Sequence, residues 1–246
     1  MLETIDYDEH WTQSLATYQS HPTSRHRRRF VMRSLRKTGV PKGTFVFDYG
    51  CGPGLLLKEI QDLYRLADSQ LGGCDLSPEA IKAARASFNS PFFYNQSFPD
   101  LERPIDIAVT TEVIEHTSEY EEILRWLWDH LRNDGILIVT TPGGSMDPPD
   151  VYYGHVQHFR LHELSRLLER LGFHLHISRY WGFPFFTLQK WVTKKYFFKV
   201  RDGYMDGDMS TKKRMVFTLA YYIYMVHDLI PYGPQIFLLA RKTPHR

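Results

Sequence analysis

The sequence predicts an α/β protein built around a mostly parallel sheet. Short runs rich in β-formers alternate along the chain with segments of helical spacing, which is the pattern of strand–helix–strand units. The glycine-rich and polar motifs of the chain also follow directly after predicted strands. Ligands of such sheets bind beyond the carboxyl ends of the strands, so these motifs are expected to meet at one edge. The expected strands span residues 44–48, 70–75, 92–94, 105–110, 135–141, 175–180 and 235–241.

The helices between these strands carry start and stop signals. Ser77 has the side chain of an N-cap, and Pro78 suits the first helical position. Gly172 follows an amphipathic segment and predicts its C-terminal end. The expected helices span residues 25–37 and 55–66, a segment that starts at Ser77, and residues 122–131, 162–171, 187–200 and 211–230.

Length and composition favour a single domain over residues 1–246. The chain is long enough for a full core and an insertion, and 43% apolar with 24% charged residues is ordinary for a folded protein. These values exclude a disordered or fibrous chain. Cys51 and Cys74 are the two cysteines of the sequence, which excludes a disulfide framework.

Export and membrane insertion are not expected. Residues 1–10 are acidic and lack the apolar segment of a signal peptide, so a cytoplasmic location is expected. The longest apolar stretch, residues 215–230, is about one turn short of the roughly 20 residues that span a bilayer. That stretch also contains His227 and Asp228, so no transmembrane segment is predicted.

A glycine-rich turn follows the first predicted strand. Residues 45–54 read Phe-Val-Phe-Asp-Tyr-Gly-Cys-Gly-Pro-Gly, with glycine at every second position from 50 to 54. Glycine lets the backbone approach a ligand closely, but this spacing differs from the G-x-G-x-x-G of dinucleotide sites. Asp48 would repel a pyrophosphate and suits a ligand that carries an ammonium group. Asp75 ends the second strand, where a carboxylate can accept both ribose hydroxyls of an adenosine.

Two segments of the sequence together resemble motifs I and II of class I S-adenosylmethionine-dependent methyltransferases. They are Phe-Asp-Tyr-Gly-Cys-Gly-Pro-Gly and the later Gly-Cys-Asp-Leu-Ser-Pro-Glu. The resemblance covers residues 44–173. It implies a Rossmann-like, seven-stranded sheet whose last strand is antiparallel. It also implies that the glycine turn supports the methionine part of S-adenosylmethionine, that Asp75 holds the ribose and that Leu76 packs on the adenine. The cofactor contacts so implied are Asp48, Gly50, Cys51, Gly52, Gly54, Asp75, Leu76, Ser97, Phe98, Thr111 and Glu112.

A second polar motif, Thr-Thr-Glu-Val-Ile-Glu-His, follows the fourth strand. If a helix starts there, Glu112, Glu115 and His116 lie on one face at i, i+3 and i+4. Two carboxylates and an imidazole can bind a divalent metal ion, with His158 from a later His-Val-Gln-His run as a fourth ligand. Other interpretations stay open: Glu112 lines the cofactor cleft, His116 or His158 acts as a general base without metal, or the histidines serve packing.

This combination resembles two branches of the family, the ubiquinone-biosynthesis O-methyltransferases and the small-RNA 2′-O-methyltransferases. Both branches imply a metal ion that activates an acceptor hydroxyl. The resulting hypothesis is O-methylation of a small molecule in biosynthesis, with Glu112, His116 and His158 as catalytic residues. The alternatives are a metal-dependent RNA 2′-O-methyltransferase and a catalytically silent cofactor-binding subunit. The near balance of 30 basic and 28 acidic residues argues against a nucleic-acid partner. The arginines between residues 25 and 29 keep that alternative open.

Residues 181–234, between the last two strands, predict a helical insertion of unusual length for a strand connection. Residues 181–246 carry 11 Lys/Arg and 4 Asp/Glu, a net charge of +7, which suits an anionic substrate, a membrane surface or nucleic acid. The insertion is expected to cap the active-site mouth or to join subunits of a homo-oligomer. Its aromatic residues either wall an acceptor pocket or attach the insertion to the sheet: Trp181, Phe183, Phe185, Phe186, Tyr221, Tyr222 and Tyr224.

Overall fold

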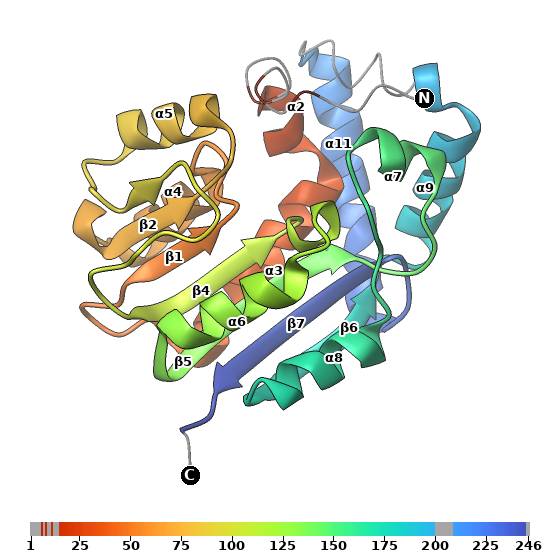
Figure 1. Cartoon of the computed structure of the whole chain (residues 1–246). Helices are drawn as coiled ribbons and strands as arrows, with labels where there is room; N and C mark the ends of the chain where they lie inside the picture. The colour runs from red at the N-terminus through yellow and green to blue at the C-terminus, as the bar shows by residue number, and fades with distance from the viewer. Residues whose placement is uncertain (1–5, 7, 9–10, 12–14, 200–208, 245–246) are drawn as a thin grey trace.

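A seven-stranded sheet forms the centre of the molecule (Figure 1). The computed structural model describes residues 6, 8, 11, 15–199 and 209–244. The strand order is β3-β2-β1-β4-β5-β7-β6, and β7 runs antiparallel to both of its neighbours while the other pairs are parallel. The expected antiparallel last strand is therefore confirmed. The strands are β1 (Val46–Tyr49), β2 (Leu71–Cys74), β3 (Phe93–Tyr94), β4 (Ile105–Thr111), β5 (Leu131–Pro142), β6 (Phe173–Trp181) and β7 (Gln235–Lys242).

Helices connect the strands and cover both faces of the sheet (Figure 1). The capping signals hold, because the Ser77 hydroxyl accepts the backbone N–H of Ala80 and Pro78 opens the helix that follows. The helices are α2 (Leu15–Ser20), α3 (Pro22–Thr38), α4 (Leu55–Tyr64), α5 (Pro78–Ser87), α6 (Tyr120–His130), α7 (Pro148–Tyr152), α8 (Leu161–Arg170), α9 (Phe185–Lys195) and α11 (Thr211–Ile223), with short 3₁₀ turns η1 (Asp68–Gln70), η2 (Ile114–His116) and η3 (Tyr224–Leu229).

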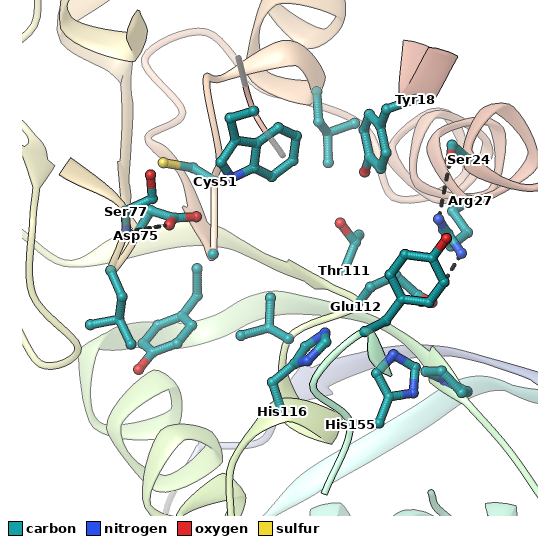
Figure 2. Close-up of a pocket in the computed structure, with 18 of the residues that line it drawn as sticks. Tyr18, Ser24, Arg27, Cys51, Asp75, Ser77, Thr111, Glu112, His116 and His155 are labelled. Carbon is teal, nitrogen blue, oxygen red and sulfur yellow. Dashed lines mark hydrogen bonds and ion pairs between the residues drawn. The ribbon is translucent and has the colours of Figure 1, made fainter. Parts of the chain in front are cut away.

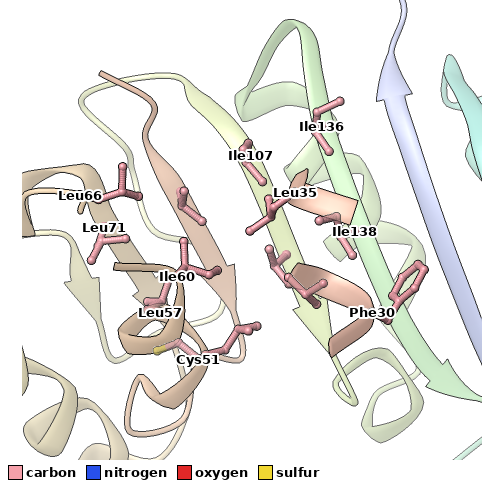
Figure 3. Close-up of a cluster of buried hydrophobic side chains, with 14 of the residues drawn as sticks. Phe30, Leu35, Cys51, Leu57, Ile60, Leu66, Leu71, Ile107, Ile136 and Ile138 are labelled. Atoms are coloured by element: carbon pink, nitrogen blue, oxygen red, sulfur yellow. The ribbon is translucent and has the colours of Figure 1, made fainter. Parts of the chain in front are cut away.

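Two apolar clusters bury the two faces of the sheet. On one face, Phe30 and Leu35 of α3 and Ile60 of α4 pack with sheet residues such as Ile107 and Ile138 (Figure 3). The other face packs against α6 and α8. Burial on both sides explains the near-continuous apolar runs of the central strands. It also fixes the carboxyl ends of these strands, from which the polar motifs project.

The insertion between β6 and β7 is helical and is attached to the rest of the molecule through buried contacts. Trp181 is 1% exposed, and its indole N–H donates to Asp228 Oδ1 at 3.3 Å. Asp228 in turn pairs with Arg29 and Arg33 of α3 at 2.7 and 2.6 Å. The two helices are shorter than expected, because α9 ends at Lys195 and α11 gives way to η3 after Ile223; residue 200 lies outside the described residues. Of the described helices, none has the length and apolar character to cross a membrane.

His26 provides a test of this attachment. Its Nε2–H donates to the carbonyl of Tyr221 at 2.8 Å, and burial lowers its pKa from 6.5 to about 4. Between pH 6.5 and 4 the unfolded chain therefore binds a proton at His26 that the folded chain excludes. The contribution of His26 to the free energy of unfolding is thus complete above pH 6.5 and falls as the pH drops toward 4. We expect the free energy of unfolding to drop by about 1–2 kcal/mol more between pH 7.5 and 5.0 in the wild type than in His26→Gln.

Urea unfolding at the two pH values measures this difference. His162→Gln, a substitution at an exposed histidine, is the matched control and should keep the wild-type pH dependence. An unchanged pH dependence in His26→Gln would show that His26 is not responsible.

Candidate active site

A cavity of about 720 Å³ lies at the carboxyl ends of β1, β2 and β4. Figure 2 shows Asp75 and Cys51 on one side of it, Arg27 and Glu112 on the other, and His116 and His155 below. The lining therefore comes from segments far apart in the sequence, as expected for the switch point of an open sheet.

Backbone hydrogen bonds hold the glycine turn against the end of β2. The backbone N–H groups of Gly50 and Cys51 both donate to the carbonyl of Cys74, at 2.8 and 2.9 Å. The N–H of Gly52 donates to Asp75 Oδ2 at 2.8 Å. Gly50 has a φ of 77°, and an added Cβ there would lie 2.2 Å from Val113, so this position requires glycine.

Two carboxylates, those of Asp48 and Asp75, lie beside this turn and differ in the hydrogen bonds that they accept. Asp75 accepts two backbone N–H groups, from Gly52 and Ser77 at 2.8 and 2.9 Å, although burial still raises its pKa. Asp48 is 2% exposed, and its Oδ1 has no hydrogen-bond partner among the described residues. Burial, and then the charge of Asp75, raises the pKa of Asp48 well above its usual range. A cationic group bound here would stabilise Asp48 as a carboxylate.

Nine of the eleven predicted cofactor residues line the cavity, and the structure places the other two, Gly52 and Gly54, in the supporting turn. The apolar side chains of Leu76 and Phe98 are 72% and 39% exposed at the cavity, which suits contact with a flat ring. The nine lining residues are Asp48, Gly50, Cys51, Asp75, Leu76, Ser97, Phe98, Thr111 and Glu112.

The expected helix at Glu112 is wrong. Glu112 has a φ of 58°, the left-handed region, because the chain turns sharply between β4 and the short η2. Its side chain accepts hydrogen bonds from Thr140 at 2.9 Å and Gln235 at 2.7 Å, and it pairs with Arg27 at 3.0 Å. Glu112 therefore lines the cavity as part of a polar network, and it is not one of the residues whose possible ligand atoms group with those of Glu115 and His116.

Glu115 and His116 come together with His155 instead. Glu115 is fully buried; its Oε2 accepts the hydroxyl of Thr141 at 2.9 Å, and its Oε1 has no hydrogen-bond partner among the described residues. Burial raises the pKa of Glu115, and the charge of Glu112 adds to this. His116 Nε2 lies 3.9 Å from Oε1, and one possible ligand atom from each of Glu115, His116 and His155 lies within 4.8 Å of the others. This group could hold a divalent metal ion.

His158 lies behind His155 and is not among the residues that line the cavity. His155 Nδ1 and His158 Nε2 are 2.9 Å apart, and His158 Nδ1 lies 3.1 Å from the carbonyl of Ser145. Since that carbonyl can only accept, a neutral His158 donates from Nδ1 and accepts at Nε2 from His155 Nδ1–H. The Nε2 of His155 then keeps its lone pair. The sequence singled out His158 of this histidine run, whereas the ring that lines the cavity is that of His155, because i, i+3 spacing does not tell which ring faces inward.

Of the seven predicted aromatic residues of the insertion, Trp181 and Tyr224 are buried in the core cluster, whereas Phe183, Phe185 and Tyr222 are exposed. Trp181 packs against Phe237 at a ring-centroid distance of 5.5 Å and against His26 at 4.9 Å, whereas Phe186 alone of the seven predicted aromatics lines the cavity. Helix α9 adds three polar lining residues that sequence reasoning missed, Gln189, Lys190 and Thr193. The amino group of Lys190 lies 3.2 Å from both carboxylate oxygens of Asp150.

Comparisons with known proteins identify a family and a shared fold. The sequence model of a family described as "Methyltransferase domain" matches residues 23–176. A malonyl-[acyl-carrier protein] O-methyltransferase of Bacillus anthracis is 24% identical over 100 residues, a match that spans 40% of this chain and 37% of that protein.

Solved structures of similar fold include a putative sarcosine dimethylglycine methyltransferase from Galdieria sulphuraria. That structure has a TM-score of 0.63 and 13% identity, covering 89% of this chain and 86% of the other. Phosphoethanolamine N-methyltransferase 2 of Haemonchus contortus, solved with S-adenosyl-L-methionine, has a TM-score of 0.58 and 14% identity, covering 87% of this chain and 52% of that one. At these identities the structural likeness shows the shared fold.

The Arg27–Glu112 pair can be tested by a double-mutant cycle. Glu112→Ala leaves a half-buried guanidinium without its carboxylate, so we expect the free energy of unfolding to fall by about 1–3 kcal/mol. In Arg27→Ala/Glu112→Ala the loss should be smaller than the sum of the two single losses, because the partners are removed together.

Urea unfolding of the four proteins measures the cycle. The exposed pair Lys82–Glu79 is the control, for which the same cycle should give a coupling near zero. Additive losses at Arg27 and Glu112 would show that the pair is not coupled.

Proposed function

This chain belongs to the class I S-adenosylmethionine-dependent methyltransferases, and from that premise we propose that it methylates an oxygen atom of a small-molecule acceptor. The observation that carries the proposal is the single cavity of about 720 Å³ that joins the Asp48–Asp75 region to the polar wall of Glu112, His116 and His155. Methyl transfer requires donor and acceptor to be aligned in one enclosed space, and a cavity of this size suits two small molecules.

The residues present fit the cofactor. Asp75 would hold the ribose hydroxyls, Leu76 and Phe98 would contact the adenine, and the unsupported Oδ1 of Asp48 would face the ammonium group of the methionine part. When bound, S-adenosylmethionine supplies an electrophilic sulfonium methyl group. The chain must then align an acceptor oxygen and remove or mask its proton.

His116 and His155 are proposed to accept a hydrogen bond from the acceptor hydroxyl at the cavity wall. Burial lowers the pKa of both rings, that of His155 to about 2, so both are neutral at pH 7 and keep a lone pair. His158 acts through His155, because it accepts the Nδ1–H of His155 and so directs the bare Nε2 of that ring. Glu112 has a different role in this proposal: with Arg27 it shapes the wall between the two ligands.

A divalent metal ion at Glu115, His116 and His155 is the second form of the same proposal. The fit rests on the buried Oε1 of Glu115, which has no hydrogen-bond partner among the described residues, and on two neutral imidazoles beside it. When bound, such an ion would supply Lewis-acid activation of a hydroxyl. Asp150, His155 and His158 form a second possible group, but the amino group of Lys190 already neutralises Asp150.

The acceptor side of the proposal rests on the insertion. Helix α9 brings Phe186, Gln189, Lys190 and Thr193 to the cavity, so residues 181–234 are proposed to cap the acceptor within one methyltransferase domain over residues 1–246. The O-methyltransferase named among the relatives supports oxygen as the methylated atom.

Asp75→Ala tests the cofactor site. Loss of the carboxylate removes hydrogen bonds to the ribose, and we expect S-adenosylhomocysteine to bind about 10- to 100-fold more weakly, a loss of about 1–3 kcal/mol. Isothermal titration calorimetry measures the affinity, with the exposed Leu63→Ala on α4 as a control that should bind like the wild type. Tighter binding of a nicotinamide dinucleotide than of S-adenosylhomocysteine would contradict the proposal.

Turnover of hydroxyl-bearing acceptors tests the chemistry. A screen that detects release of S-adenosylhomocysteine, run with and without a chelator, should find an oxygen acceptor; loss of turnover with chelator assigns the metal form. His155→Asn should reduce kcat at least about tenfold while leaving the affinity for S-adenosylhomocysteine unchanged. Cofactor binding without turnover of any acceptor would favour a silent subunit, and turnover of RNA alone would exclude the small-molecule proposal.

A further inference from the structure

Helix α9 presents two different faces. Its inner face, with Phe186, Gln189 and Lys190, lines the cavity. On the opposite side Leu188, Trp191 and Val192 follow one another at i, i+3 and i+4 and are 56%, 57% and 37% exposed. Large apolar side chains on one stripe of a helix normally mark a surface that another phase or molecule covers.

Helix α11 repeats this arrangement. Its inner face packs on the N-terminal helices, with the Phe217 ring 5.2 Å from His21 and the guanidinium carbon of Arg25 3.8 Å from the centre of the Tyr221 ring. The outer face carries five large apolar residues: Met215 (68% exposed), Val216 (55%), Leu219 (62%), Tyr222 (60%) and Ile223 (41%).

The charge of both helices has one sign. Together α9 and α11 contain six Lys/Arg residues and no Asp or Glu. Lys190 and Lys194 pair with Asp150 and Asp147, whereas Lys195, Lys212 and Arg214 lie exposed beside the apolar stripes. An apolar stripe with exposed Trp or Tyr and flanking basic residues is the pattern of helices that lie in a membrane interface.

We propose that the outer faces of α9 and α11 bind the surface of an anionic lipid membrane. Leu188, Trp191, Met215 and Leu219 would enter the boundary between headgroups and acyl chains, and Lys195 and Lys212 would contact anionic headgroups. The helices lie on the membrane in this arrangement and do not cross it.

Charge complementarity selects a lipid surface over a second copy of this chain. In a two-fold symmetric dimer each outer face would meet its own copy, so basic residues would oppose basic residues. A bilayer rich in anionic headgroups instead supplies a continuous surface of opposite charge. The expected homo-oligomer through the insertion thus becomes one outcome of the test.

Sedimentation of the full chain with vesicles tests the proposal. The wild type should bind phosphatidylcholine vesicles that contain phosphatidylglycerol, bind vesicles of phosphatidylcholine alone much more weakly, and lose binding as salt is raised. Leu219→Glu should reduce binding by on the order of tenfold, because it removes a leucine that would enter the membrane and adds a negative charge. Leu63→Glu, at a leucine that is 44% exposed on α4, is the matched control and should bind like the wild type.

Lys212→Glu is the second variant, since it leaves every apolar residue in place, and it should weaken binding several-fold on anionic vesicles only. Affinity for S-adenosylhomocysteine and the melting temperature verify that each variant is folded. The proposal is overturned if the wild type does not sediment with anionic vesicles, or if Leu219→Glu binds like Leu63→Glu. It is equally overturned if gel filtration shows a wild-type dimer that Leu219→Glu dissociates.

Discussion

The burial of carboxylates along one edge of the sheet is the constraint on which the site depends. Asp48 and Glu115, which are buried, and Asp75 and Glu112, which are partly buried, lie at or just beyond the carboxyl ends of strands, and an uncompensated buried charge is costly. Glu112 has an arginine, and Asp75 has two backbone N–H groups. Asp48 and Glu115 each keep one buried oxygen without a hydrogen-bond partner among the described residues. The fold therefore supplies partners for Asp75 and Glu112 itself. It leaves Asp48 and Glu115 as two positions at which a bound cation would be favoured.

Helix α3 ties this edge to the rest of the molecule. Its apolar face, with Phe30 and Leu35, belongs to the core, while Arg27 reaches the cavity and pairs with Glu112. On another side His26 and Arg29 contact the insertion. One helix thus sets the position of the cavity wall and of the insertion together, so a shift of α3 would change both.

The sequence was most informative where local chemistry decides structure. The glycine spacing, Asp75 and the Ser77–Pro78 helix start are each determined by contacts within a few residues or by one strand neighbour, and they lie where expected. Prediction failed at Glu112, because helical spacing was extrapolated through a position that the turn after β4 forces into a left-handed conformation. It also could not tell His155 from His158, since the orientation of each ring depends on Ser145 and on α7, which the local sequence does not specify.

The two-sided character of α9 has a consequence for how relatives of this protein can diverge. The inward positions 186, 189, 190 and 193 line the cavity, and the outward positions 188, 191 and 192 are exposed on the surface of the protein. Because the two sets alternate with the helical period, substitutions in one set leave the side chains of the other in place. If the proposed roles of the two faces hold, acceptor choice and membrane binding can change through separate mutations in the same eleven-residue helix.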